Sequence, residues 1–119
     1  YSLADSAEYY FVVNVLDPSV NLSPSRFGIG QFNRVKYTDS VIKHQLKAVN
    51  SQNQLIFVGA FFSRQAVADY SRNIVPLMKD IMKIPTNKYN TFFISKQNLD
   101  KLTNREKVDQ YIEYYQKNF

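Results

Sequence analysis

The sequence predicts an α+β domain built on a four-stranded antiparallel sheet, with a further helix added at the C-terminus. Residues 8–16 and 54–61 are apolar on both faces, as the central strands of a covered sheet are. Residues 42–49 alternate between apolar and polar side chains, which is typical of a half-exposed edge strand. Helical patterns lie between and after the strands, so the elements follow one another as β-α-β-β-α-β-α.

Length and composition indicate one globular domain. The chain has 119 residues, of which 45% are apolar and 15% aromatic, and this is enough for a single core. The first residue is Tyr1 rather than an initiator Met. We expect residues 1–7 to be a linker from a longer upstream protein and residues 8–119 to form a single α+β domain.

The first half of the chain supplies a buried strand and a helix. Residues 8–16, EYYFVVNVL, are almost all residues that favour β-structure. Ser23 followed by Pro24 predicts a helix start, because Ser caps helices and Pro suits the first helical position. An apolar stripe is expected along that helix, made of Phe27, Phe32 and Val35.

The second half begins with the strand 54–61 and continues into a helix that Ser63 should cap. Apolar residues recur along this helix at helical spacing, namely Val67, Tyr70, Ile74, Met78 and Ile81. Pro76 should kink or split the helix, because it removes an interior hydrogen bond. Residues 85–90 are expected to form a loop, and residues 91–95, TFFIS, a short strand.

The last part of the chain predicts a short helical turn and then a longer helix. Ser95 is expected to cap a turn that runs to Leu102. Thr103 and Glu106 have the spacing of a capping box, which starts the final helix. Tyr114 should point away from the apolar face of that helix, which consists of Val108, Tyr111, Ile112 and Tyr115.

This order of elements fits a split β-α-β, ferredoxin-like sheet. In such a sheet the first and third strands lie in the centre and the second and fourth at the edges, and the two doubly apolar strands are indeed the first and third. The face of the sheet without helices would expose too much apolar surface to water. We therefore expect the C-terminal helix, or a partner, to cover that face.

Two binding modules have a strand similar to residues 54–61. RNA-recognition motifs contain an aromatic strand resembling IFVG, but TFFIS lacks their Gly-aromatic-Gly pattern and the final helix would cover the base-stacking face, so nucleic acid is not expected as a partner. The stretch FVGAFFSRQA also resembles the Val-Gly-x-Phe strand end and Ala-containing helix of SPOR domains. That resemblance implies recognition of peptidoglycan glycan, although the first strand lacks the matching Gly-x-Phe.

A second resemblance runs over almost the whole chain. The sequence is similar to the C-terminal domain of large tetratricopeptide-repeat lipoproteins of Bacteroidetes in its short motifs, which are Phe32-Asn33, Ala68-Asp69-Tyr70, Phe93-Ile94-Ser95, Asn98, Leu102 and residues 111–118. This resemblance implies a periplasmic domain, tethered to the outer membrane through its parent lipoprotein. It also implies a role beside the type IX secretion and gliding-motility machinery.

The sequence offers little that could carry catalysis. His44 is the only histidine and there is no cysteine, so a zinc site or a His-assisted nucleophile has no support. A Gly-rich phosphate loop is absent as well, since neither Gly28 nor Gly30 belongs to such a motif. No apolar run is long enough for a transmembrane segment. We expect a non-catalytic chain that needs no cofactor and no metal.

The function predicted from these observations is docking to a protein partner in the cell envelope, and glycan binding in the SPOR manner is the alternative. The net charge of +5 permits an anionic partner, although the basic residues are scattered. Lys43 and Lys47 lie on the polar side of the edge strand 42–49, and Tyr114 and Phe119 lie near the C-terminus. These four residues form the predicted interaction surface.

Overall fold

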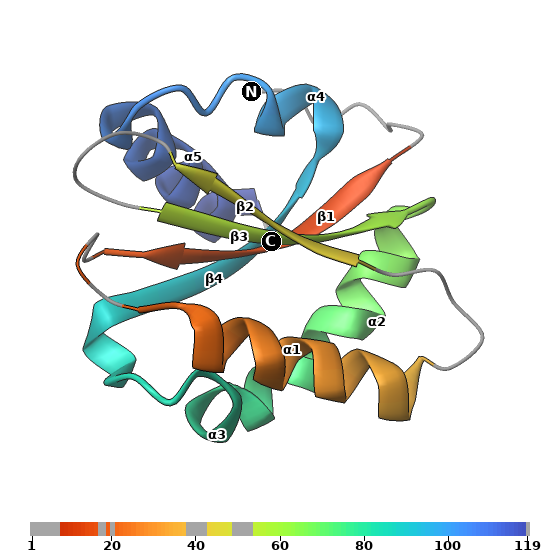
Figure 1. Cartoon of the computed structure of the whole chain (residues 1–119). Coiled ribbons are helices and arrows are strands. Elements are labelled where there is room, and N and C mark those ends of the chain that lie inside the picture. The colour runs from red at the N-terminus through yellow and green to blue at the C-terminus, as the bar shows by residue number, and fades with distance from the viewer. Residues whose placement is uncertain (1–7, 17–18, 20, 38–42, 49–53, 119) are drawn as a thin grey trace.

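The computed structural model describes residues 8–16, 19, 21–37, 43–48 and 54–118, with the backbone alone for residues 43–48 and Arg105. It confirms the α+β class, with an antiparallel sheet and several helices (Figure 1). The strands are β1 (Tyr9–Val15), β2 (Lys43–Ala48), β3 (Gln54–Phe61) and β4 (Tyr89–Ser95). The helices are α1 (Ser23–Lys36), α2 (Arg64–Ile74), α3 (Met78–Met82), α4 (Lys96–Leu99) and α5 (Arg105–Asn118), with short 3-10 turns η1 (Val75–Leu77) and η2 (Thr86–Lys88).

The strands lie side by side in the order β2-β3-β1-β4, and each neighbouring pair is antiparallel. The apolar strands β1 and β3 are therefore central, and β2 is an edge. In the register of the sheet Val12 pairs with Phe57 of β3 on one side and with Phe92 of β4 on the other. Residues that pair across strands share a face of the sheet, so these three positions face the same side.

The first core fills the space between the sheet and the helices α1, α2 and α3, which lie below the sheet in Figure 1. Its side chains come from alternate positions of the strands and from one face of each helix. They are Tyr9, Phe11, Val13, Val15, Leu22, Ile29, Phe32, Ile56, Val58, Phe61, Val67, Tyr70, Ile74, Met78, Met82 and Phe93.

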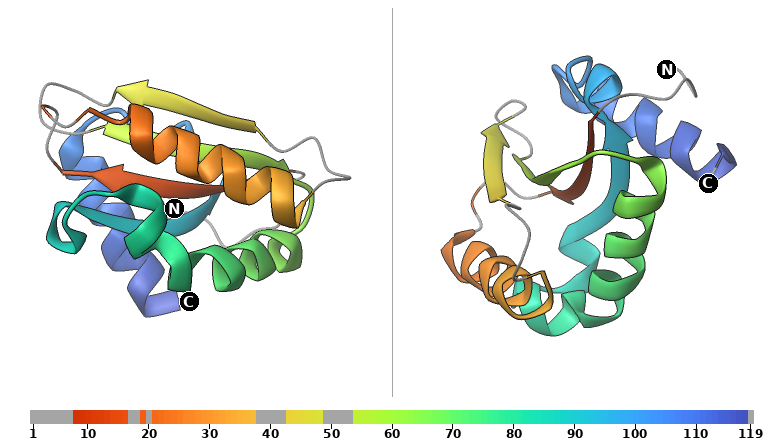
Figure 2. Two further views of the ribbon diagram at one scale, coloured as in Figure 1. Left: turned by 60° about the horizontal axis from the view of Figure 1, so that its bottom comes forward. Right: turned by 90° about the vertical axis from the view of Figure 1, so that its right-hand side faces the viewer.

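The second core lies on the opposite face of the sheet, beneath α4 and α5 (Figure 2). It consists of Val12, Leu55, Phe92, Ile94, Leu99, Leu102, Val108 and Tyr111. The expected covering of this face by the C-terminal helix is thus confirmed. The tyrosines of α5 also reach the backbone of β4, since the Tyr111 hydroxyl donates to the Phe93 carbonyl oxygen at 2.8 Å.

The buried face of α1 differs from the expected stripe. Phe32 is buried, but Phe27 and Val35 are 62% and 69% exposed, so the prediction for those two residues was wrong. The buried face carries Ser25 and Asn33 instead, together with Ile29 and Phe32. These polar side chains are buried because each has a partner: Ser25 donates to the carbonyl oxygen of Met82, and Asn33 accepts from the Tyr70 hydroxyl at 2.6 Å.

The start of α1 also needs a correction. Ser23 is already a helical residue, and the N-cap position is Leu22, without a capping side chain. The Asn21 side chain accepts a hydrogen bond from the Ser23 backbone N–H at 3.0 Å. Asn21 therefore satisfies one of the free amides that the first turn of every helix exposes.

Two glycines allow elements to approach closely. A Cβ added to Gly28 would lie 2.6 Å from the carbonyl oxygen of Ile81, so α1 and α3 could not pack as they do with a larger residue. A Cβ on Gly59 would lie 2.5 Å from the ring of Tyr10. The Gly in the IFVG stretch is therefore explained by packing within the sheet, where it leaves room for a neighbouring aromatic ring.

The helix that follows β3 behaves as predicted. The Ser63 hydroxyl accepts from the Ala66 N–H at 3.0 Å, which confirms the cap. The helix is split at Pro76 into α2, η1 and α3. Val67, Tyr70, Ile74 and Met78 are buried and Ile81 is partly buried against the first core, so the expected apolar face is confirmed.

The predictions for the C-terminal part were right about the elements and wrong about some of their ends. Ser95 caps α4, but this helix ends at Leu99 rather than Leu102. The cap of α5 is Asn104, whose side-chain oxygen accepts from the Lys107 N–H at 2.9 Å. The capping box of Thr103 and Glu106 was therefore misplaced by one residue.

Candidate docking surface

The residues predicted as an interaction surface are only partly described. Lys43 and Lys47 lie on the edge strand β2, where their backbones pair with Gly59 and Leu55, but their side chains are outside the described part of the structure. His44, also on β2, pairs with Val58, and nothing is described of its ring. Phe119 lies outside the described residues. These positions therefore stay predictions.

Tyr114 does not point away from the protein as the sequence predicted. It is half-buried and packs against the second core, with its ring centroid 5.6 Å from that of Tyr111. The spacing rule failed because α5 lies across the sheet and buries more than one row of side chains. Tyr114 still reaches the surface, so its contribution to an interface stays a prediction.

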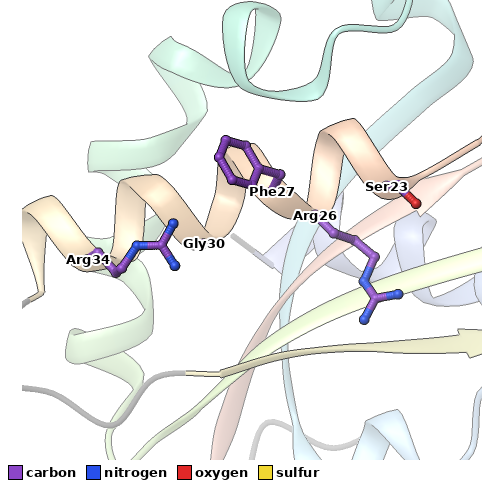
Figure 3. Close-up of a pocket in the computed structure, with 5 residues that line it drawn as sticks. All are labelled: Ser23, Arg26, Phe27, Gly30 and Arg34. Carbon is purple, nitrogen blue, oxygen red and sulfur yellow. The ribbon is translucent and has the colours of Figure 1, made fainter.

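A different surface, not predicted from the sequence, lies on the outer side of α1. Ser23, Arg26, Phe27, Gly30 and Arg34 line an open hollow of about 260 Å³ there. Figure 3 shows the guanidinium groups of Arg26 and Arg34 on either side of Gly30 along the helix, with the ring of Phe27 projecting from the other edge of the ribbon. We call these five residues the α1 surface.

The helix itself creates this arrangement. Ser23, Phe27, Gly30 and Arg34 follow one another at intervals of four, three and four residues, which places them in one row along a helix. The row faces solvent because the polar residues Ser25 and Asn33 take the opposite, buried side. The same spacing is visible in the sequence, but the apolar pattern places Phe27 in the core, so the pattern does not reveal this row.

The charge of α1 is entirely positive. Its residues include Arg26, Arg34 and Lys36 and no carboxylate. Neither arginine of the α1 surface forms an ion pair with any carboxylate in the described part of the chain. The Nε atom of Arg26 is shielded from solvent and meets no hydrogen-bond partner among the described groups. The charge of the two guanidinium groups is thus not neutralised by any described carboxylate, which suits an anionic ligand.

A second hollow, of about 370 Å³, lies at the other end of the same helix. It is lined by Lys36, Tyr37, Asn73, Pro76 and Leu77. The Asn73 side-chain amide donates to the Tyr37 hydroxyl at 3.0 Å, and the Tyr37 ring packs at 5.2 Å from that of Tyr70. Its walls are thus held by contacts with the first core, but a single lysine is the only charge that lines it among the described residues.

No group of three or more His, Cys, Asp or Glu side chains that could hold a metal occurs within the described ranges. Tyr70 is fully buried, and this burial raises its pKa; the neighbouring Tyr37 acts in the same direction, while the hydrogen bond to Asn33 opposes the shift. Tyr70 therefore keeps its proton at neutral pH.

The aromatic pair Tyr10 and Phe57 lies on the sheet face that α5 covers. Their rings meet edge to face at 5.6 Å, and both are only half-buried against the second core. The Tyr10 hydroxyl donates to Glu8 at 3.0 Å. Burial raises the pKa of Tyr10, and the neighbouring Glu8 acts in the same direction. This pair is the part of the second sheet face that α5 leaves partly open.

Among the helices of the described ranges, none has the length and apolar character that crossing a membrane requires. Comparisons of the chain with models of protein families, with curated proteins and with solved structures gave no match. The surfaces described above are therefore the basis for the proposed function.

Proposed function

We propose that this chain is a non-catalytic docking module that binds a protein partner, and that its fold is ferredoxin-like with an added C-terminal helix. The fold proposal is supported by the strand order β2-β3-β1-β4 with antiparallel neighbours, which a split β-α-β unit produces when its two crossover helices pack on one face. Here α1 and α2 both lie on the face of the first core.

One observation carries the docking function. Helices pack on both faces of the sheet, and yet α1 leaves the apolar side chains of Phe27 and Val35 more than half exposed. These side chains lie on the same helix as two arginines that form no ion pair with a described carboxylate. An apolar side chain beside guanidinium groups is a common composition at protein interfaces, where aromatic residues and arginine are enriched. A surface of this kind binds without any chemical step.

The wider setting is a further part of the proposal. The motifs shared with tetratricopeptide-repeat lipoproteins of Bacteroidetes support a place at the C-terminus of an envelope protein. In that setting the domain is periplasmic, held at the outer membrane through its parent lipoprotein, and contributes to type IX secretion or gliding motility by holding a partner protein in place.

Glycan binding in the SPOR manner is the second candidate, and the Tyr10–Phe57 pair favours it. Both rings are half-exposed on the sheet face that such a domain would use, and exposed aromatic rings offer flat apolar surfaces for a sugar. The same face also carries Phe92 and Val12, which α5 buries. A glycan would thus have access only to the part of the face nearest β3.

Two measurements on the full chain separate these functions. Co-sedimentation with peptidoglycan sacculi, intact or stripped of stem peptides, should leave the domain in the supernatant at physiological salt. A photo-crosslinking residue at Gln31, exposed on α1, should label a discrete protein in the envelope of the producing cell, whereas the same residue at Gln116, exposed on α5, should not. Salt-resistant pelleting that favours stripped sacculi would overturn the docking proposal and establish glycan recognition.

A further inference from the structure

The α1 surface has a regular spacing of charge. Arg26 and Arg34 are separated by eight residues of one helix, so their Cα atoms lie about 12 Å apart along the axis. Gly30 is midway between them, and the ring of Phe27 projects from the other edge of the helix. The surface therefore presents two cations with a glycine between them and an aromatic ring beside them.

An extended peptide matches this spacing. Side chains at i, i+2 and i+4 of an extended chain point to one face, and i and i+4 are about 13 Å apart. Carboxylates at i and i+4 would meet the two guanidinium groups, and an apolar side chain at i+2 would reach the depression at Gly30 beside Phe27. Arginine binds carboxylates in a planar, two-pronged geometry that fixes this register.

We propose that the α1 surface binds an acidic segment of the partner protein with the pattern acidic-x-apolar-x-acidic. This inference rests on the docking function proposed above and gives the partner its chemistry. The positive net charge of the whole chain, +5, adds long-range attraction for such a segment.

Two other anionic partners fit the surface less well. A phosphate polymer such as a nucleic acid gains affinity from closely spaced cations, whereas here a glycine and an exposed phenylalanine separate the two arginines. A lipid surface is flat and wide, while the α1 surface is a hollow of about 260 Å³ bounded by side chains of a single helix. The apolar centre between two cations therefore favours a polypeptide.

The proposal is tested by titrating the full chain with a short synthetic peptide that carries Glu at i and i+4 and Leu at i+2. The control peptide has the same composition, with the two Glu residues adjacent and the Leu at one end. Backbone amide NMR shifts locate the binding, and fluorescence anisotropy gives the dissociation constant. The patterned peptide should shift residues of α1 and bind more tightly than its control.

Substitutions then identify the contacts. R26Q and R34Q should each weaken binding about tenfold, as the loss of a charged hydrogen bond implies. F27S should weaken it as well and leave the fold intact, since Phe27 is 62% exposed. The matched controls are R72Q, which removes an exposed arginine on α2, and F62S, which removes a 76% exposed ring elsewhere; both should change affinity by less than about twofold.

Each remaining outcome counts against the proposal. Equal binding of the two peptides, or equal effects of R34Q and R72Q, would mean that only general charge attraction acts. A different outcome is that the chain binds anionic vesicles and not the peptide, with the vesicle binding weakened by F27S and R34Q. That result would overturn the acidic segment and identify a membrane as the partner of the α1 surface. If the peptide causes no NMR shifts in α1 while the photo-crosslinker at Gln31 still labels a protein, the acidic segment is wrong and the docking function remains supported. Pelleting with sacculi would instead remove the docking function itself.

Discussion

The two cores each place a buried tyrosine at their centre, but they hold its hydroxyl group in different ways. Tyr70 of the first core donates to the side chain of Asn33, 37 residues away in the sequence. Tyr111 of the second core donates to the backbone oxygen of Phe93, 18 residues away. A strand carbonyl exists wherever the strand forms, whereas a side-chain acceptor must be brought in by a second helix. The first core therefore depends on the correct docking of both α1 and α2.

The aromatic packing differs in the same sense. Tyr70 lies among four rings from β1, β3, α1 and the residue that follows α1, at centroid distances between 4.9 and 5.7 Å; they are Phe11, Phe61, Phe32 and Tyr37. Tyr111 packs on Phe92 of β4 and on Tyr114 and Tyr115 of its own helix. The first core is thus the more interconnected of the two, and losses there should spread further through the fold.

The largest effect should follow the truncation of either central tyrosine. Tyr70→Ala should cost about 4 kcal/mol of unfolding free energy, because a large buried side chain leaves a cavity among several rings. Tyr111→Ala should cost less, about 3 kcal/mol, since α5 can shift on the sheet to fill part of the space. Urea unfolding followed by circular dichroism measures both. Equal costs would contradict the claim that the first core is more interconnected.

A substitution at Gly28 tests how tightly α1 and α3 approach beside the first core. Gly28→Val should destabilise the protein by about 2 kcal/mol, because its Cβ would meet the Ile81 carbonyl and force the helices apart. Gln31→Val, which adds the same type of side chain to an exposed position of the same helix, is the control for helix propensity. Thermal unfolding gives the difference in melting temperature between the two variants. Equal melting temperatures would show that α1 can move away from α3 without loss of stability.

Alkaline pH provides a third test. Burial raises the pKa of Tyr70 above its ordinary value of 10.0, so the folded protein keeps a proton that the unfolded chain releases. Stability from this group is complete below pH 10.0 and declines as the pH rises above that value. Urea midpoints measured across that range should fall, and the fall should be shallower in Tyr70→Phe than in Tyr89→Phe, because Tyr89 is only half-buried. Parallel curves for wild type and Tyr70→Phe would refute this assignment.

The smallest effect concerns the start of α5, which covers the second core. Asn104→Ala should cost about 1 kcal/mol, the usual value for a lost N-cap. Thr103→Ala, at the neighbouring exposed position, should change the unfolding free energy by less than about 0.5 kcal/mol. Chemical denaturation of both variants decides between the two caps. A larger cost at Thr103 would restore the capping box that the sequence suggested.

Much of the framework could be read from the sequence because local signals determine it. The apolar run at residues 8–16 produces β1, the Ser63 hydroxyl caps α2, and Pro76 divides the helix after it. Each of these features depends on a residue and its near neighbours in the chain. The apolar row of α5 was also correct for Val108 and Tyr111, because a sheet face in need of cover lay opposite it.

The side of α1 that faces the core was decided only by tertiary structure. Sequence pattern favoured Phe27 and Val35 for the interior, but Ser25 and Asn33 are buried there because Met82 and Tyr70 supply their hydrogen-bond partners. Those partners are 57 and 37 residues away in the sequence, so no local pattern could predict these hydrogen bonds. The same rotation of the helix exposes Phe27 between two arginines and creates the α1 surface. Backbone preferences and apolar spacing are local, so they are enough to define which segments form strands and helices. The orientation of α1, by contrast, depends on distant hydrogen-bond partners that only the folded chain brings together.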